Sequence, residues 1–381
     1  MKSKKLSTAA LLLGAALVIS GCAGTTDAPS DTSTPDDTDY IVDAAAEGIT
    51  EEQAAYLTEL YEAAQDEGGL TIYSGTPDDL VEVYALFEET FPGVSVTAEG
   101  LIGAPLVQAL STENASNNHV ADILHNPDAQ LYVNENAAGD FGEPYEVQTL
   151  EVPEALAGSA DSIIDPEHRF NVPFLGYFGL GTFLPRSSEA GAPPESFADL
   201  SDPRFTGLIG MGDPTIPGPQ QAALLYLLNS GGLTEEDLTG LGANASLKGD
   251  YGQAIGGLMQ GEFPFMFGAP VSAVVKAADA GAPVEFRVFS EYNPLISHKH
   301  VLLQGAPNPN TAKLYIEFMN LLSAQELLAE VGFMPLDERA ADPAAPWTSI
   351  TESGATEIVD HTVIDESRSR LLPLIEQAFK N

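Results

Sequence analysis

The chain has 381 residues, of which 44% are hydrophobic, and this is enough to bury a core of two lobes. Its 56 acidic and 15 basic residues give a formal net charge of -41, which argues strongly against binding to nucleic acid phosphates. Two explanations of this charge are open. The acidic residues form a solvated surface that keeps the protein soluble or suits it to a saline medium, or they attract cations. A single cysteine excludes any intramolecular disulfide.

The N-terminus has the layout of a secretory signal. Lysines close to the start precede a short apolar run from Leu11 to Ile19, and this run is too short to span a bilayer. The small residues before Cys22 resemble a bacterial lipobox, which implies cleavage after residue 21 and a thiol that carries diacylglycerol, with palmitate on the same cysteine. We therefore expect a lipoprotein signal peptide over 1–21, and an ordinary cleaved signal with an incidental cysteine is the alternative.

A polar segment separates this signal from the folded part. Residues 22–49 begin with the cysteine and continue through a stretch rich in Thr, Ser, Asp and Pro with almost no large apolar side chain. Such a composition cannot bury a core, so we expect a disordered tether between the lipid and the folded domain.

The first part of the folded chain alternates strands and helices. Thr50 and Gln53 have capping-box spacing, which predicts a helix start, and Gly68-Gly69 predicts its end. The pattern then predicts strands over Leu70–Tyr73, Val94–Ala98 and Val120–Leu124, and helices over Asp78–Phe91 and Pro105–Glu113. This alternation predicts a parallel α/β sheet with its ligand at the carboxyl ends of the strands. The candidate loops are Ser74-Gly75-Thr76, 100–104 and His125-Asn126.

The second part begins with an apolar, glycine-punctuated and β-like stretch from Arg169 to Pro185. Beyond it, the sequence predicts strands over Leu208–Met211, 262–268, Val284–Phe289 and Val301–Gln304. The predicted helices cover Gln220–Asn229, Tyr251–Gly261, Val271–Ala280, Ala312–Leu322, Ala324–Glu330 and Arg368–Phe379.

Sequence signatures of catalysis are absent. The chain has no Gly-x-Ser-x-Gly, His-Glu-x-x-His, Cys-x-x-Cys or Walker sequence, which disfavours an enzyme. His298 and His300 have the spacing of one strand face, so they form either a metal-binding pair or a polar strand edge. Adjacent carboxylates such as Asp78-Asp79 are common here and carry little information, and Tyr84 lies on the apolar face of its predicted helix.

Several segments, taken together and in order, resemble one family. They are "LTIYSGTPDDLVEVYALFEETFPGVSV", "VADILHNPDAQ", "VPFLGYFGLGTF", "PPESFADLSDPRFTGLIGMGDPTIPG" and "GAPNPNTAKLYIEFMNLLSAQELLAEVGFMPL". The chain resembles extracellular solute-binding proteins of ABC importers, in the group of ferric-ion, thiamine, putrescine and 2-aminoethylphosphonate receptors. This resemblance covers the chain from about residue 69 to residue 336.

The resemblance implies an α/β, two-lobed type 2 periplasmic-binding-protein fold with a ligand cleft between the lobes. We expect lobe 1 to comprise residues 50–175 and 296–381, and lobe 2 to comprise residues 176–295. The chain would cross between lobes near Val172–Phe178 and near Ser290–His298. The lobes would close by a hinge, and a membrane permease would read the closed form.

The same resemblance places candidate ligand-binding residues in these loops. In lobe 1 they are Ser74, Gly75, Thr76, His125 and Asn126; in lobe 2 they are Thr215, Gly218, Phe267, Gly268, Ser272 and Tyr292, with Tyr177 at the crossover. Backbone N–H groups at helix starts are free to hold an acceptor group. For each residue, a plain turn or cap is the alternative.

The residues also bear on the ligand. Ferric-ion members of the family carry a His in the first loop and an adjacent Tyr pair in lobe two, and this chain has neither, although Tyr177, Tyr292, His125 or an anion would be substitutes. A small organic solute therefore ranks first, and the acidic field favours a cationic one. Iron ranks second and phosphonates third, because the expected loops carry no Arg.

We accordingly expect an import subunit that is a monomer on the extracellular face of the membrane. Its partners would be a small solute, an ABC permease and the membrane itself through the lipid anchor, and it would need no cofactor and no metal. A lipoprotein enzyme with a scattered site and a sensor of the same fold are the alternatives.

Overall fold

Two groups of parallel strands are joined by two long antiparallel strands. The computed structural model describes residues 41–127, 141–153, 156, 160–216, 219–289, 291–340, 356–359 and 361–380. In this part of the chain, eight strands follow the order β2-β1-β3-β9-β4-β7-β5-β6, while β8 and β10 pair with β4 and β11 pairs with β9. The strands are β1 (Gly69–Ser74), β2 (Ser95–Gly100), β3 (Ile123–Asn126), β4 (Asn171–Phe183), β5 (Ile209–Gly212), β6 (Ala245–Lys248), β7 (Phe265–Pro270), β8 (Val284–Arg287), β9 (Asn293–Leu302), β10 (Met334–Pro335) and β11 (Thr356–Ile358).

We call β2-β1-β3 with the end of β9 the first sheet half, and β7-β5-β6 the second sheet half. Strands β1, β2 and β3 pair in parallel, as do β5, β6 and β7. Strand β4 serves both halves, because its residues 171–177 pair with β9 and its residues 178–182 pair with β7. The predicted crossing near 172–178 lies in β4, and residues 293–298 of the other lie in β9. The α/β fold class is confirmed.

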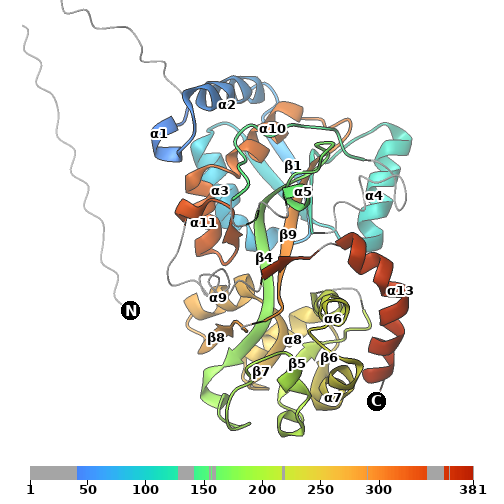
Figure 1. Ribbon diagram of the computed structural model, residues 1–381. Coiled ribbons are helices and arrows are strands. Elements are labelled where there is room, and N and C mark those ends of the chain that lie inside the picture. The colour runs from blue at the N-terminus through green and yellow to red at the C-terminus, as the bar shows by residue number, and fades with distance from the viewer. Residues whose placement is uncertain are drawn as a thin grey trace, which may run out of the picture. The chain divides into compact units, whose positions relative to one another are not determined.

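Helices cover both faces of the sheet (Figure 1). Helices α2, α3, α10 and α11 lie on one side of the first sheet half, and α4 lies on the other. The α-helices are α1 (Ala44–Glu47), α2 (Glu51–Ala64), α3 (Val81–Thr90), α4 (Gly103–Ser116), α5 (Ala160–Ile163), α6 (Pro219–Ser230), α7 (Glu235–Asn244), α8 (Tyr251–Met259), α9 (Val271–Asp279), α10 (Pro309–Phe318), α11 (Leu322–Glu330) and α13 (His361–Ala378). Short 3-10 helices are η1 (Pro77–Asp79), η4 (Leu184–Arg186), η5 (Ala198–Ser201), η6 (Pro203–Phe205) and η7 (Glu338–Ala340).

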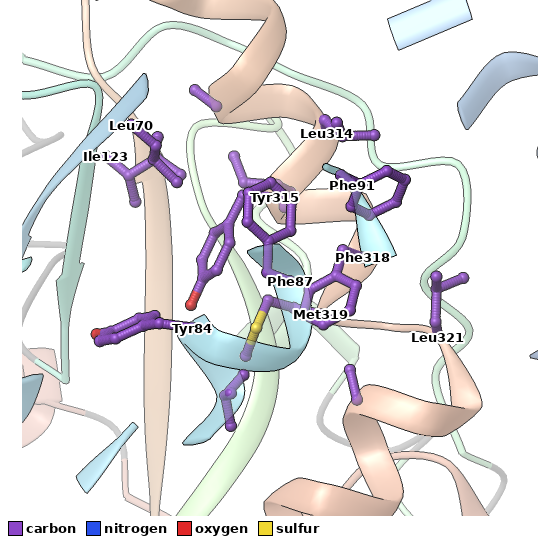
Figure 2. Packing of buried hydrophobic residues seen from close by; sticks show 14 of the residues in the cluster. Leu70, Tyr84, Phe87, Phe91, Ile123, Leu314, Tyr315, Phe318, Met319 and Leu321 are labelled. Atoms are coloured by element: carbon purple, nitrogen blue, oxygen red, sulfur yellow. The ribbon is translucent and has the colours of Figure 1, made fainter. Parts of the chain in front are cut away.

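An aromatic cluster fills the first core, which we define as the buried residues between α2, α3, α10 and the first sheet half. The ring of Phe87 packs edge-on against Tyr315 at 5.2 Å and against Phe318 at 5.3 Å (Figure 2). The predicted capping box of α2 is confirmed, because Thr50 and Gln53 exchange their backbone and side-chain hydrogen bonds. This cap fixes the start of a helix that lends Leu57 and Leu60 to the core.

The helix predicted over 78–91 is divided in two. Pro77–Asp79 forms η1, and α3 begins only at Val81, because Leu80 has φ -114 and ψ 13 rather than helical values. The break keeps Asp79 on a short turn in front of α3 instead of inside a regular helix.

The C-terminal helix differs from its predicted place in lobe 1. Leu371 and Ile375 of α13 belong to the second core, the buried cluster around β5, β7, α6 and α7, and α13 packs on both helices. Gly242 of α7 permits this approach, since a Cβ there would lie 2.3 Å from the carbonyl oxygen of Ala378. Apolar residues on α13 therefore find their partners in the second sheet half.

The structure also contains α7 and β6, which the sequence pattern does not predict. Thr234 caps α7 by accepting from Asp237 N at 3.1 Å, and the Asp237 carboxylate accepts from Thr234 N at 2.9 Å. This is a capping box with Asp in place of Glu or Gln, and its spacing was visible in the sequence.

Two glycine-to-alanine variants are expected to change stability in opposite directions. A Cβ on Gly210, in the middle of β5, would lie 2.0 Å from the buried ring of Phe263, so Gly210→Ala should cost about 2 kcal/mol of unfolding free energy. Nothing lies within 4 Å of the same atom on Gly256, inside α8, so Gly256→Ala should add about 0.5–1 kcal/mol. Urea unfolding followed by circular dichroism measures both, and equal effects of the two variants would contradict the packing described here.

Candidate functional site

The turn after β1 is held together by its own hydrogen bonds. Ser74 is fully buried, and its Oγ accepts from Thr76 N at 3.1 Å. Gly75 N donates to the carbonyl of His125 at 2.9 Å, which ties this turn to the end of β3. Thr76 precedes Pro77 as the sequence predicted, but its hydroxyl forms no cap and has no hydrogen-bond partner among the described residues.

His125 faces the interior of the sheet. Its ring is 1% exposed, with Nδ1 3.0 Å from Ser74 Oγ and Nε2 3.1 Å from Nδ1 of His298. Burial lowers the pKa of His125 to about 3, so the ring is neutral at ordinary pH. Both ring nitrogens are engaged inside the protein, so this predicted ligand-binding side chain instead positions the turn after β1. Asn126, next along the chain, is also buried.

His298 and His300 do not form a strand edge. Strand β9 lies between β3 and β4, and both rings are buried against Phe174. Among the described residues, no group of three or more His, Cys, Asp or Glu side chains is placed to hold a metal ion. The pair is therefore part of the polar interior of the sheet.

The predicted polar and glycine residues of lobe 2 that the structure describes lie at or near helix starts, apart from the predicted aromatic residues. Ser272, at the start of α9, is 4% exposed, and its Oγ donates to Oδ2 of Asp79 at 3.4 Å. Gly268 lies beside the start of α6, where its carbonyl accepts from Gln220 Nε2 at 3.4 Å. Thr215 precedes this helix and donates to Asp213 Oδ1 at 2.7 Å. Gly218 lies outside the described residues, as do Cys22, the signal peptide and residues 22–40 of the predicted tether.

Three predicted aromatic residues lie elsewhere. Phe267 is fully buried in the second core, with its ring 5.7 Å from that of Phe197. Tyr177 is 2% exposed and packs edge-on against Phe286. Tyr292 lies against Gly232, just after the C-terminal end of α6, whereas Gly268 lies beside the N-terminal end of the same helix. Helix α6 has 12 residues and is about 18 Å long. These rings are not gathered at one site, because two of them complete cores and the third covers a helix end.

Asp79 brings the predicted residue Ser272 together with Lys276, which no sequence pattern singled out. Its carboxylate receives the hydrogen bond of Ser272, while Lys276 Nζ, one turn further along α9, donates to the carbonyl of Asp78 at 3.0 Å. Burial raises the pKa of Asp79, whereas the Lys276 ammonium and the Ser272 hydroxyl lower it. The first and second sheet halves therefore meet at a partly desolvated carboxylate.

Two tyrosines lie within range of the charge of this carboxylate. Burial raises the pKa of Tyr84 to about 12 and also raises the pKa of Tyr251, and the charge of Asp79 contributes to both shifts. Tyr84 is 8% exposed, and its hydroxyl faces Ser74 without forming a hydrogen bond to any described residue. Figure 2 shows its ring extending from α3 away from Phe87 and Phe318. We call Thr76, Asp79, Tyr84, Tyr251, Ser272 and Lys276 the junction site.

A pocket of about 450 Å³ lies apart from the junction site. It is lined by the α1–α2 connection, residues 149–153 and residues 336–339. Ile49 in this lining packs against the first core, whereas Leu150, Val152 and Leu336 pack in another cluster that includes Tyr177 and Val271.

Two parallel-stranded halves are thus joined by crossing strands, and polar loop residues of both halves meet between them. The profile of the family described as "Bacterial extracellular solute-binding protein" matches residues 118–355, more than half of the chain. The chain belongs to this family of bacterial extracellular solute-binding proteins. A search of curated protein sequences gave no match.

Solved structures of several binding proteins share the fold. The substrate-binding protein of an ABC transporter from Agrobacterium tumefaciens has a TM-score of 0.67 and 15% identity, over 82% of this chain and 94% of that one. Apo ferric ion-binding protein A of Pasteurella haemolytica has a TM-score of 0.63 and 18% identity, over 82% and 99%. The spermidine/putrescine-binding protein PotD of Streptococcus pneumoniae has a TM-score of 0.60 and 16% identity, over 81% and 99%.

Proposed function

We propose that this protein is the solute-binding subunit of an ABC import system, which captures a small organic molecule between two lobes and delivers it to a membrane permease. The observation that carries the proposal is the junction site in a chain of the solute-binding family: strand-end loops of both sheet halves meet there, at Asp79 and Ser272. We assign 50–175 and 296–340 to the first lobe, and 176–289 with 361–380 to the second, because α13 packs on α6 and α7. The protein binds its solute without chemical change.

Membrane attachment is part of the same proposal. None of the described helices is long and apolar enough to cross a bilayer, and the lipobox-like sequence before Cys22 supplies an anchor of another kind. The folded part would then work as a tethered monomer outside the cell membrane. The intact mass of protein extracted from membranes tests the anchor, because an unmodified Cys22 on the mature chain would rule it out.

A ferric site receives no support from this arrangement. The candidate substitutes for the missing His and Tyr pair are dispersed: His125 and Tyr177 are buried, and Tyr292 lies at the opposite end of α6. Fe(III) nevertheless belongs in the test as a comparison.

A thermal-shift screen followed by calorimetry tests the function. The mature chain is heated with separate additions of putrescine, choline, thiamine, 2-aminoethylphosphonate, glucose, succinate and Fe(III). A solute present at 100 times its Kd should add about 2.7 kcal/mol to the free energy of unfolding, since it binds only the folded protein. Failure of a broad solute collection to stabilise the chain, together with no calorimetric binding, would sink the proposal.

A further inference from the structure

We propose that the solute is a small organic cation and that Asp79 is the carboxylate that recognises its ammonium group. This inference rests on the proposed function and adds the chemical class of the solute. It also gives Lys276 a role, as the cation that stands near Asp79 when no solute is bound.

The first step in the argument is that Asp79 is incompletely satisfied. The hydrogen bond that reaches its carboxylate comes from Ser272 at 3.4 Å, near the outer limit for such a bond. The nearby ammonium of Lys276 donates instead to the carbonyl of Asp78. A carboxylate has about four acceptor positions, so Asp79 retains capacity for a strong donor.

The second step is a pair of buried hydroxyls on the segment that carries this carboxylate: Thr76, whose carbonyl accepts from Asp79 N at 3.2 Å, and Tyr84 on α3. Tyr84 Oη and Thr76 Oγ1 are buried atoms without hydrogen-bond partners among the described residues. A buried hydroxyl left unpaired costs free energy, so these two oxygens are ready for a ligand. An ammonium group has three N–H donors. One carboxylate and two hydroxyl oxygens match that number of donors, and Tyr84 and Tyr251 both lie within range of the charge of Asp79.

The third step is the sign of the charge. The charges of Asp78 and Glu82 both act on Asp79 and raise its pKa, and Lys276 is the cation that opposes them. An anionic solute would meet a net negative surface here, and the chain as a whole carries -41. A cationic solute is attracted both by these local acidic groups and by the negative charge of the whole chain.

The fourth step concerns Lys276. It lies four residues after Ser272 on α9, so both side chains leave the same face of this helix toward η1. Its side chain is exposed, and its ammonium links the second sheet half to the carbonyl of Asp78 in the first. A solute ammonium that enters the site would bind Asp79 at closer range than Lys276 does. The positive charge of Lys276 would then repel this ammonium.

Three variants test these roles by calorimetry with the cation that the screen identifies among putrescine, choline and thiamine. Asp79→Asn keeps the shape of the side chain and removes its charge, and it should weaken binding about 10–100-fold. Asp78→Asn is the matched control, since it removes the neighbouring exposed charge but keeps the carbonyl that Lys276 uses; it should weaken binding less than about threefold. Lys276→Gln should strengthen binding about two- to fivefold, since it removes the competing cation.

The outcomes separate this inference from the proposed function. If the wild type binds glucose, succinate or Fe(III) rather than a cation, the protein remains a solute receptor but the inference is wrong. Equal losses in Asp79→Asn and Asp78→Asn, or a loss in Lys276→Gln as large as that in Asp79→Asn, would also overturn it. Unchanged melting temperatures of the three unliganded variants show that each remains folded. If the wild type binds no solute, the proposed function itself fails.

Discussion

Replacing Glu317 with alanine is expected to lower the free energy of unfolding by about 4 kcal/mol. The reason is that removal of a buried carboxylate leaves all the donors that bind it unpaired. Glu317 is fully buried on α10. Its carboxylate accepts from the backbone N–H of Gln148 at 3.0 Å and of Thr149 at 2.9 Å, and from the Tyr145 hydroxyl at 2.5 Å. These bonds fasten residues 145–149 to the first core.

Two controls isolate the contribution of this network. Glu317→Gln keeps the shape and one acceptor oxygen, so its loss should be smaller than that of Glu317→Ala. Glu326→Ala removes an exposed carboxylate from the neighbouring α11 and should change stability by less than about 0.5 kcal/mol. Urea unfolding gives all three values, and a loss under 1 kcal/mol for Glu317→Ala would show that the bonds do not hold this segment.

Acid is expected to destabilise the protein through its buried histidines. Burial lowers the pKa of His125 to about 3 and the pKa of His300 well below 6.5. Since the unfolded histidines titrate near 6.5, the unfolded chain binds more protons below that pH, and stability falls as the pH decreases. For His125 the loss between pH 7.5 and pH 5 is about 2 kcal/mol, from the 1.5 pH units below 6.5 at about 1.36 kcal/mol each, and His300 adds a loss of the same sign.

His300→Leu separates this effect from the titration of the many carboxylates. Both ring nitrogens of His300 are buried without hydrogen-bond partners among the described residues, so an apolar replacement removes no bond. The stability of the wild type relative to His300→Leu should fall from pH 7.5 to pH 5, measured by urea unfolding at each pH. A pH-independent difference would contradict a neutral buried ring.

The fold was readable from the sequence where local signals were strong. The capping box at Thr50 and the apolar run of β1 mark their elements directly, because each depends on neighbours in the chain. The place of α13 was not readable, since its apolar face fits either sheet half and only the approach at Gly242 decides between them.

The junction site was even less accessible to sequence reasoning. Tyr84 has the spacing of a core residue and does contact the first core, but its hydroxyl reaches past it toward Ser74. Asp79 looks like one carboxylate among 56 acidic residues, and only its contact with Ser272, 193 positions away, distinguishes it. Conversely, Phe267 and His125 have the chemistry of ligand residues, but burial places them inside the sheet halves.

The two ends of the described chain are fastened to different sheet halves. Helix α2 is part of the first core, whereas α13 is part of the second, so the separation between residue 44 and residue 380 changes with any hinge motion between them. The protein has one native cysteine, at position 22. With Cys22→Ser, cysteines introduced at those two positions would accept a donor and an acceptor dye, and energy transfer would then report opening and closing in single molecules without any label near the solute.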